Sequence, residues 1–326
     1  MRSLEGALSR CAAAGIRPGL DAILAVCAAM GDPQDSVRVV HVAGTNGKGA
    51  VCALVDSALR AVGFRCGRYT SPHLVSVTER FFLDGAPVSG AELDAAFNRL
   101  PRIPQVADLT YFELLTAVAF ELYREKRVDF LVLETGLGGR LDATNVVKRP
   151  DVCVITSIGL DHCEWLGSDI PSIAAEKGGI IKPGVPVVLG AMPGSARETI
   201  ERIASVRGAP CVRAMEWMEK GSCGEGADAV GGPIRDCALG GMFNARNAAV
   251  ALAALKMLGV DDDAIRRGFA SAAWPGRYQR IESGGRSFLI DGAHNPPAMR
   301  ALADSLKREP PVSEGGFSAG AVVCGF

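Results

Sequence analysis

Residues 39–50 read VVHVAGTNGKGA, in which an apolar, β-branched strand leads into glycines and a lysine just before a helical segment. Backbone N–H groups at such a helix N-terminus bind phosphate oxygens, and the lysine adds a positive charge for the terminal phosphates. The strict pattern G-x-x-x-x-G-K-[ST] needs glycine where Val42 stands and a hydroxyl where Gly49 stands. The segment therefore predicts a phosphate-binding loop, with a structural glycine turn as the alternative. In the first case, the hydroxyl that helps to hold a metal ion must come from elsewhere.

Outward from this segment, short β-branched runs alternate with longer segments of helical period, which is the pattern of a parallel sheet covered by helices. We therefore predict an α/β fold with a mainly parallel sheet. The predicted strands are residues 37–42, 128–133, 152–157, 185–189, 288–290 and 321–324. The predicted helices are residues 48–62, 111–125, 174–181, 244–258, 261–272 and 296–307. Residues 218–241 are rich in glycine and lack a helical period, which favours hairpins or loops.

The length of 326 residues leaves room for about two domains. A Pro-Gly pair at Pro275-Gly276 follows the helix predicted at 261–272, and we place a hinge there. The expected domains are residues 1–275 and 276–326. The second has room for one strand-helix-strand unit and stops on the apolar run 321–326, so we expect it to be incomplete.

Composition excludes several classes of protein. Hydrophobic residues make up 48% and charged residues 22%, and 35 Lys and Arg against 36 Asp and Glu give a net charge of −1. This balance gives no bulk attraction to nucleic acid or to a membrane. No stretch suggests a membrane span or a secretion signal, so we expect a cytosolic protein. The ten cysteines include no C-x-x-C pair, which argues against a zinc cluster and a disulfide framework.

Polar residues after the other strands are candidates for a site, each with a structural alternative. Glu134 ends a buried strand before a glycine-rich turn, where a magnesium ligand or a capping carboxylate would lie. Ser71 lies in a Ser-Pro turn, and Lys177 near a helix end, where it could simply favour the helix dipole. The four histidines, which all lie at or beside strand ends or Gly/Pro-rich turns, favour a site; they are His41, His73, His162 and His294. Asp291 and Asn295 are candidates for capping the helix that starts at Pro296.

Six motifs in order resemble the folylpolyglutamate synthase/dihydrofolate synthase family of the Mur-ligase superfamily. They are HVAGTNGKG (41–49), TSPH (70–73), GLGGRLDATN (136–145), SIGLDH (157–162), Glu176-Lys177 with IIKPG (180–184), and DGAHN (291–295). The resemblance implies a Mur-ligase-type P-loop ATPase domain plus a smaller Rossmann-like domain. It implies a ligase that uses ATP to join L-glutamate to the carboxylate of a folate or dihydropteroate through an acyl phosphate. We expect a cytoplasmic monomer.

The resemblance also implies roles for particular residues. Ser71 and Glu134 would bind one Mg²⁺ and His162 a second, and Lys177 would be carbamylated. Lys48, His162 and Lys177 are the catalytic candidates. The nucleotide-binding candidates are Gly44, Thr45, Asn46, Gly47, Lys48, Gly49, Asn247, Arg277, Asp291 and His294.

Two positions depart from the family pattern. Phe243-Asn244 replaces a His-Gln pair, and Ala50 replaces a serine. Together with the short second domain, they leave a non-catalytic nucleotide-binding fragment or degenerate paralogue as the alternative. A GTPase switch is disfavoured because no N-K-x-D motif occurs.

Overall fold

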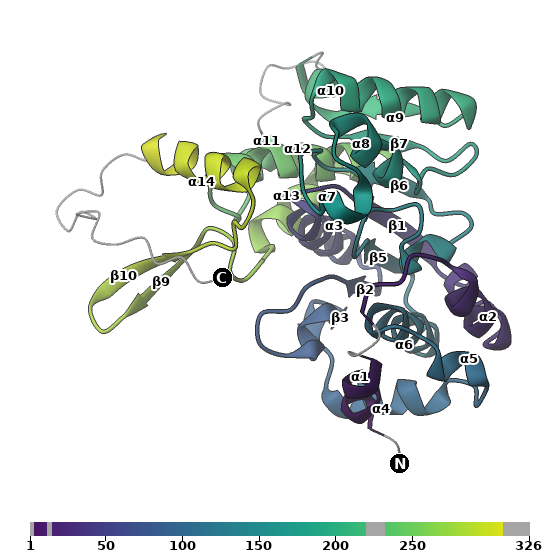
Figure 1. Ribbon diagram of the computed structural model, residues 1–326. Helices are drawn as coiled ribbons and strands as arrows, with labels where there is room; N and C mark the ends of the chain where they lie inside the picture. Colours follow the sequence, from purple (N-terminus) through teal and green to yellow (C-terminus); the bar gives the residue numbers. More distant parts are fainter. Residues whose placement is uncertain (1–2, 12–14, 220–231, 309–326) are drawn as a thin grey trace.

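The computed structural model describes residues 3–11, 15–219 and 232–308. Its centre is an eight-stranded sheet with the strand order β4-β3-β2-β5-β1-β6-β7-β8 (Figure 1). From β2 to β8 all neighbours are parallel, and only β3 and β4 run antiparallel at one edge. The strands are β1 Arg38–Ala43, β2 Cys66–Tyr69, β3 Phe81–Leu83, β4 Ala86–Pro87, β5 Phe130–Glu134, β6 Val152–Ile155, β7 Val187–Leu189 and β8 Cys211–Arg213. The predicted α/β fold with a mainly parallel sheet is confirmed.

Helices cover both faces of the sheet. They are α1 Leu4–Cys11, α2 Asp21–Ala29, α3 Lys48–Val62, α4 Gly90–Arg99, α5 Pro104–Ala107, α6 Tyr111–Glu125, α7 Cys163–Leu166, α8 Ile170–Gly178, α9 Gly194–Val206, α10 Ala214–Glu219, α11 Gly232–Arg235, α12 Met242–Met257, α13 Asp262–Ser271 and α14 Pro296–Arg308. Three 3₁₀ turns, η2 Pro33–Asp35, η3 Val77–Arg80 and η4 Ala143–Val146, join them. No helix within these described ranges is long and apolar enough to cross a membrane.

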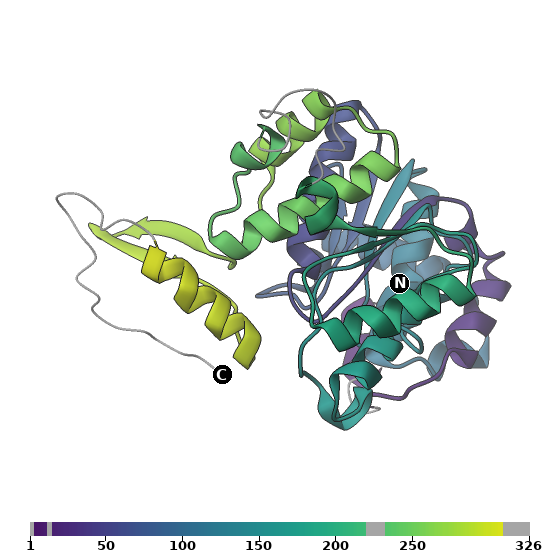
Figure 2. The same ribbon diagram turned by 90° about the horizontal axis from the view of Figure 1, so that it is seen from above.

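The alternation of side chains along the central strands explains why helices pack on both faces of the sheet. In β1, Val39 packs with α2, α4 and α6, whereas Val40 and Val42 pack with α3, α12 and α13 on the other face. Helices α8 and α9 cover the far end of the first face, against β6 and β7. Figure 2 shows α12 and α13 on one side of the sheet and α9 on the other. Because both faces are covered, the central strands are almost entirely apolar, as parallel strands usually are.

The segment after Pro275 forms a hairpin followed by a helix. Strands β9 Gln279–Ser283 and β10 Arg286–Ile290 pair antiparallel, and α14 follows them. In both ribbon views the hairpin projects away from the main sheet (Figures 1 and 2). The sequence predicted the second of these strands but missed β9, whose polar sequence QRIES does not indicate a strand.

Most of the predicted helices have the expected bounds. The helices at 48–62 and 111–125 match α3 and α6 at both ends. The prediction of hairpins or loops over 218–241 is wrong at 218–219 and 232–235, where α10 extends to Glu219 and α11 forms a helical turn, and it holds at 236–241, which form neither helix nor strand. The strand predicted at 321–324 and residues 220–231 lie outside the described residues.

Candidate active site

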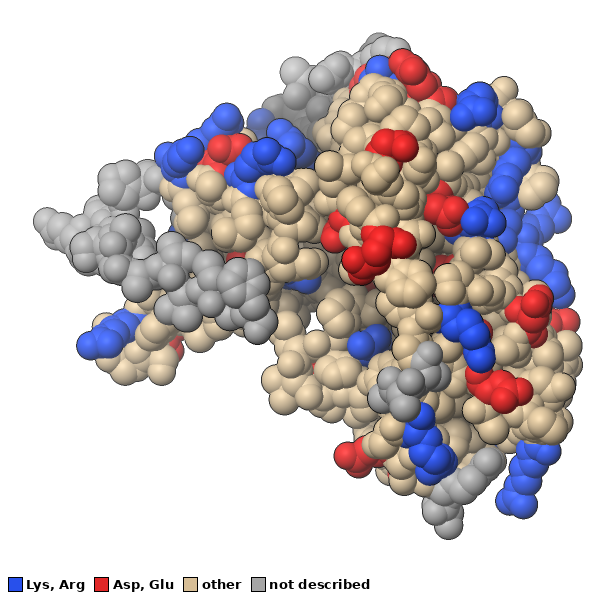
Figure 3. All heavy atoms as spheres, viewed as in Figure 1, with Lys and Arg blue, Asp and Glu red and all other residues tan. Residues whose placement is uncertain are grey.

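A cavity of about 390 Å³ lies beyond the carboxyl ends of the central strands. Parallel strands end at the same edge of a sheet, and open α/β sheets bind their ligands there. All the residues to which the family resemblance assigns a metal-binding, nucleotide-binding or catalytic role line this one cavity: Gly44, Thr45, Asn46, Gly47, Lys48, Gly49, Ser71, Glu134, His162, Lys177, Asn247, Arg277, Asp291 and His294. Figure 3 shows the surface hollowed between the main body and the part that carries α14. The structure thus brings together residues from eight separate parts of the sequence.

The loop between β1 and α3 has the backbone of a phosphate cradle. Gly47 is the N-cap of α3 with φ 86°, and Gly44 has φ 147°, both in a region that favours glycine. A Cβ atom at Gly44 would lie 2.0 Å from Thr156 Oγ1, and one at Gly47 would lie 2.3 Å from Asn247 Oδ1. Side chains at these positions would therefore clash, whereas glycine leaves the N–H groups at the start of α3 open to an anion.

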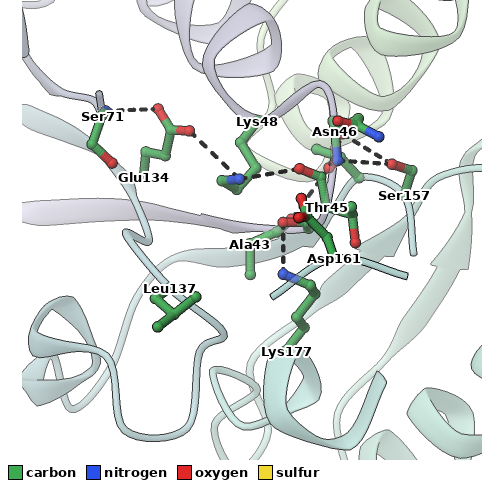
Figure 4. A network of polar contacts seen from close by, with 12 residues as sticks. Ala43, Thr45, Asn46, Lys48, Ser71, Glu134, Leu137, Ser157, Asp161 and Lys177 are labelled. Carbon is green, nitrogen blue, oxygen red and sulfur yellow. Dashed lines mark hydrogen bonds and ion pairs between the residues drawn. The ribbon is translucent and has the colours of Figure 1, made fainter. Parts of the chain in front are cut away.

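The end of β6 holds this loop in place. Thr45 N donates to Ser157 O over 2.7 Å, and Asn46 N donates to Ser157 Oγ over 3.1 Å. Thr156 Oγ1 donates to Asn46 O over 2.7 Å. Figure 4 shows this contact region between Asn46 and Ser157. The phosphate loop is therefore fixed before a ligand arrives.

Glu134 and Lys48 face each other across the cavity floor (Figure 4). Lys48 Nζ lies 3.9 Å from Glu134 Oε1, and Ser71 N donates to Glu134 Oε2 over 3.2 Å. Burial raises the pKa of the Glu134 carboxyl, although Lys48 and the Ser71 N–H oppose the rise. A carboxylate beside a serine hydroxyl is an all-oxygen donor set, which is the chemistry that Mg²⁺ prefers when phosphate oxygens complete its shell. These residues therefore fit a magnesium ion.

The structure explains why a glycine replaces the usual hydroxyl after Lys48. A Cβ atom at Gly49 would lie 2.2 Å from Cζ2 of Trp274, so the indole occupies the space of a side chain. Trp274 stands directly before the Pro275-Gly276 pair, and the guanidinium of Arg68 lies 5.5 Å from its ring centroid. The hydroxyl beside Glu134 comes instead from Ser71, on the loop after β2.

Lys177 is buried at the inner wall of the cavity, with a relative exposure of 3%. Its Nζ donates to Gly44 O over 2.9 Å, at the base of the phosphate loop. Burial and the nearby charge of Lys48 lower the pKa of the Lys177 ammonium to about 7, against the opposing effects of Asp161 and Asp142. The lowered pKa increases the fraction of this amine that is neutral, and so nucleophilic, near pH 7.

The side of the cavity beyond Pro275 is formed by the segments around β10. Asp291 is held by its own segment, because Tyr278 N and Ala293 N each donate to it over 2.8 Å. Asn295 caps α14 by accepting from Ala298 N over 3.0 Å, so Asn295 and not Asp291 makes this cap. His294 Nδ1 lies 2.8 Å from Gly292 O.

The histidines divide into two groups. His162 and His294 line the cavity, whereas His41 is fully buried within β1, where its Nε2 lies 2.8 Å from Thr144 Oγ1. Burial lowers the pKa of His41 to about 3, so its ring is neutral. His73 is bonded to Arg80 over 2.8 Å and is not a lining residue. The expectation that all four histidines lie at a ligand site therefore holds for His162 and His294 only, because the His41 side chain is buried in the core and His73 is bonded to Arg80 outside the cavity.

Two residues in the candidate motifs, to which the resemblance assigned no role, lie at the cavity or bond to a residue that lines it. Asp161 lines the cavity and lies 3.9 Å from His162 Nε2. Asn295 is 6% exposed and bonds to Asn46 across the cavity edge. Their positions, one residue before His162 and one after His294, were the available signal.

Comparisons with known proteins agree with this geometry. No family model matches the sequence. The chain is 37% identical over 324 residues to the dihydrofolate synthase/folylpolyglutamate synthase of Bacillus subtilis, covering 90% of this chain and 73% of that protein. The chain belongs to the folylpolyglutamate synthase/dihydrofolate synthase family. It is also 40% identical over 298 residues to the Escherichia coli dihydrofolate synthase/folylpolyglutamate synthase, covering 90% of this chain and 69% of that protein.

Solved structures give the same assignment. The crystal structure of Mycobacterium tuberculosis folylpolyglutamate synthase with ADP and AMPPCP matches with a TM-score of 0.80 and 35% identity, over 94% of this chain and 73% of that one. The resemblance drawn from the motifs is therefore confirmed, as is the Mur-ligase-type fold that folylpolyglutamate synthases share with this chain.

Proposed function

We propose that this chain is an ATP-dependent ligase that joins L-glutamate to the carboxylate of a folate or dihydropteroate. The substrate carboxylate attacks the γ-phosphorus of ATP, which releases ADP and leaves an acyl phosphate. The glutamate amine then attacks the acyl carbon, and phosphate leaves as the amide forms. The observation that carries this proposal is the convergence of phosphate loop, Glu134 and Lys177 on one cavity in a member of this family.

Charge explains the residue types around the cavity. A triphosphate and a carboxylate substrate repel each other, since two like charges 4 Å apart cost about 4 kcal/mol at an effective dielectric of 20. Lys48 and the N–H groups at the start of α3 offset this repulsion at the phosphates. Ser71 and Glu134 would hold one Mg²⁺ and His162 a second. A bound Mg²⁺ would neutralise charge and polarise the phosphoryl oxygens.

Lys177 is proposed to be carbamylated. Its neutral amine would add CO₂ and lose a proton, which turns a buried cation into a carboxylate facing the cavity. The lowered pKa favours this reaction, because only the neutral amine attacks CO₂. We expect ¹³C-bicarbonate to give a carbamate resonance that is absent in Lys177→Met. An unmodified wild-type amine under saturating bicarbonate would contradict this proposal.

We further propose that residues 1–275 form the ATPase domain and residues 276–326 part of a Rossmann-like domain. Asn247 from the first part and Arg277, Asp291 and His294 from the second would surround the nucleotide. Closure of the second part over the first would exclude water from the acyl phosphate. We expect the protein to be cytosolic. We expect a monomer.

The test is ADP release with each substrate omitted in turn. We expect release only when ATP, Mg²⁺, glutamate and a pterin are all present, together with a product heavier by one glutamyl unit. The alternative, a non-catalytic nucleotide-binding fragment or degenerate paralogue, predicts ATP binding with no turnover. Calorimetry with ATP, run beside the turnover assay, separates the two; family membership favours the ligase.

A further inference from the structure

Asn295 joins the two sides of the cavity through a complete set of hydrogen bonds. Its Nδ2 donates to Asn46 Oδ1 and to Asp161 Oδ2, each over 3.0 Å. Its Oδ1 accepts from Asn46 Nδ2 over 3.1 Å and from Ala298 N over 3.0 Å. An amide side chain has two donor hydrogens and two acceptor lone pairs. All four are used, although Asn46 and Asn295 are 249 positions apart in the sequence.

Two of these partners determine the orientation of the Asn295 amide. The N–H of Ala298 can only donate, so it requires the oxygen of Asn295. The carboxylate of Asp161 can only accept when ionised, so it requires the nitrogen. The reciprocal pair with Asn46 then has one arrangement, with the Asn46 nitrogen facing Oδ1 and the Asn46 oxygen facing Nδ2.

The main chain of Asn46 is fixed independently of this pair. Its carbonyl accepts from Thr156 Oγ1 over 2.7 Å and from Ser157 Oγ over 3.0 Å, at the end of β6. The position of the Asn46 side chain is therefore set by the main sheet. Because Asn295 is buried and follows His294 directly, the pair fixes the segment 291–295 against the phosphate loop.

We propose that Asn295 is a positioning residue for nucleotide binding, which couples the phosphate loop to the segment that carries Asp291 and His294. This proposal rests on the proposed function only in that the cavity binds a nucleotide. It does not require that the nucleotide is consumed. Its test therefore uses ADP affinity, which a chain without ligase activity can still show.

A second contact of α14 provides a matched control. Ser305, 2% exposed, accepts from Met242 N over 3.1 Å and so ties the far part of α14 to the start of α12. Ser305→Ala loosens α14 without touching Asn46 or Asp161. If Asn295 served only to hold α14 in place, Asn295→Ala and Ser305→Ala would weaken ADP binding to a similar extent.

The experiment is calorimetry of ADP with Mg²⁺ on the full chain and its variants. We expect Asn46→Ala and Asn295→Ala each to weaken ADP binding by about tenfold, because each leaves a buried amide partner unsatisfied. The double variant should also bind ADP about tenfold more weakly than the wild type, and not about a hundredfold, because both substitutions break the same pair. Ser305→Ala should change affinity by less than about threefold, and its effect should multiply with that of Asn46→Ala.

An isosteric variant separates the effect of the Asn295 hydrogen bonds from the effect of its side-chain size. Asn295→Asp places an oxygen where Nδ2 lies, facing Asp161 and the Asn46 oxygen, and should weaken ADP binding at least as much as Asn295→Ala. Multiplying losses for Asn46→Ala and Asn295→Ala, or an Asn295→Ala affinity equal to that of Ser305→Ala, would overturn the proposal. Wild-type ADP binding without glutamate-dependent turnover would instead remove the proposed ligase function and leave this assignment standing.

Discussion

Gly49→Ala tests the packing of Trp274 on the phosphate loop. The new methyl would lie 2.2 Å from Trp274 Cζ2, whereas ordinary contact begins near 3.4 Å, so the ring must retreat by about 1.2 Å. Arg68 limits that movement, because its guanidinium lies 5.5 Å from the ring centroid and is itself buried and paired with Asp56. Overpacking of this kind costs about 1–3 kcal/mol.

The displaced indole stands three residues before Arg277, so the strain should reach the nucleotide side of the cavity. A cost of 1–3 kcal/mol corresponds to about a 5- to 150-fold rise in the KM for ATP if it falls on the bound state. The assay is steady-state ADP release over a range of ATP concentrations, with thermal unfolding measured in parallel. Trp274→Leu in the same chain should recover part of the loss, since it removes the ring that the methyl meets.

Gly90→Ala is the matched control, because it adds the same methyl to the first turn of α4, where nothing lies within 4 Å. It should leave the KM for ATP unchanged. A Gly49→Ala variant with wild-type KM and thermal stability would refute the reasoning. So would a loss that Trp274→Leu leaves as large as before.

Three further predictions concern the inner wall of the cavity and the helix behind it. Because the pKa of Lys177 is lowered to about 7 in the folded chain, the unfolded chain binds more protons than the folded chain between pH 7 and 10.5, and the free energy of unfolding rises with pH over this range. In the absence of bicarbonate, Lys177→Met should remove this rise. Denaturant melts of both proteins across this range check the sign, and parallel curves would contradict it. Glu134→Gln should raise the Mg²⁺ concentration that gives half-maximal activity. Loss of a residue that only supports a metal ligand typically weakens metal binding by about 10–100-fold, so loss of a direct ligand should cost more. The same half-maximal Mg²⁺ concentration in the variant and the wild type would exclude Glu134 as a ligand. Asp169 is the N-cap of α8, and its carboxylate accepts from Ser172 N over 2.8 Å. Asp169→Ala should therefore lower the free energy of unfolding by about 0.5–2 kcal/mol. Asp261→Ala removes the equivalent cap of α13 and should cost a similar amount of stability, but only the Asp169 variant should alter the reactivity of Lys177, which lies on α8. Equal extents of the proposed Lys177 carbamylation in both variants would show that the α8 cap does not influence it.

The parts of the fold that local sequence specifies were predictable. Helix α6 begins at a capping box in which Thr110 and Glu113 bond each other's backbone, and its apolar period continues to Glu125. Strand β2, by contrast, has the sequence CGRY, with a glycine and a buried arginine, so nothing local marks it as a strand. It forms because β5 and β3 pair with its two edges. Tertiary pairing overrides weak propensity at such positions.

The site residues likewise include some that local sequence could predict and others that it could not. Lys48 and Glu134 could be placed because each follows a recognisable strand, and strand ends share one edge of the sheet. His41 could not be separated from the site residues by its neighbours alone, since only the register of β1 shows that it faces the core. The contact of Trp274 with Gly49 depends on segments far apart in the sequence, and no local pattern contains it.

Hydrogen exchange measured with and without AMPPCP and Mg²⁺ tests most directly whether these segments form one nucleotide site. The structure predicts that residues 44–49, 157–162 and 291–298 gain protection together and at the same ligand concentration. Protection of 44–49 alone, with the other two segments unchanged at saturation, would contradict the account.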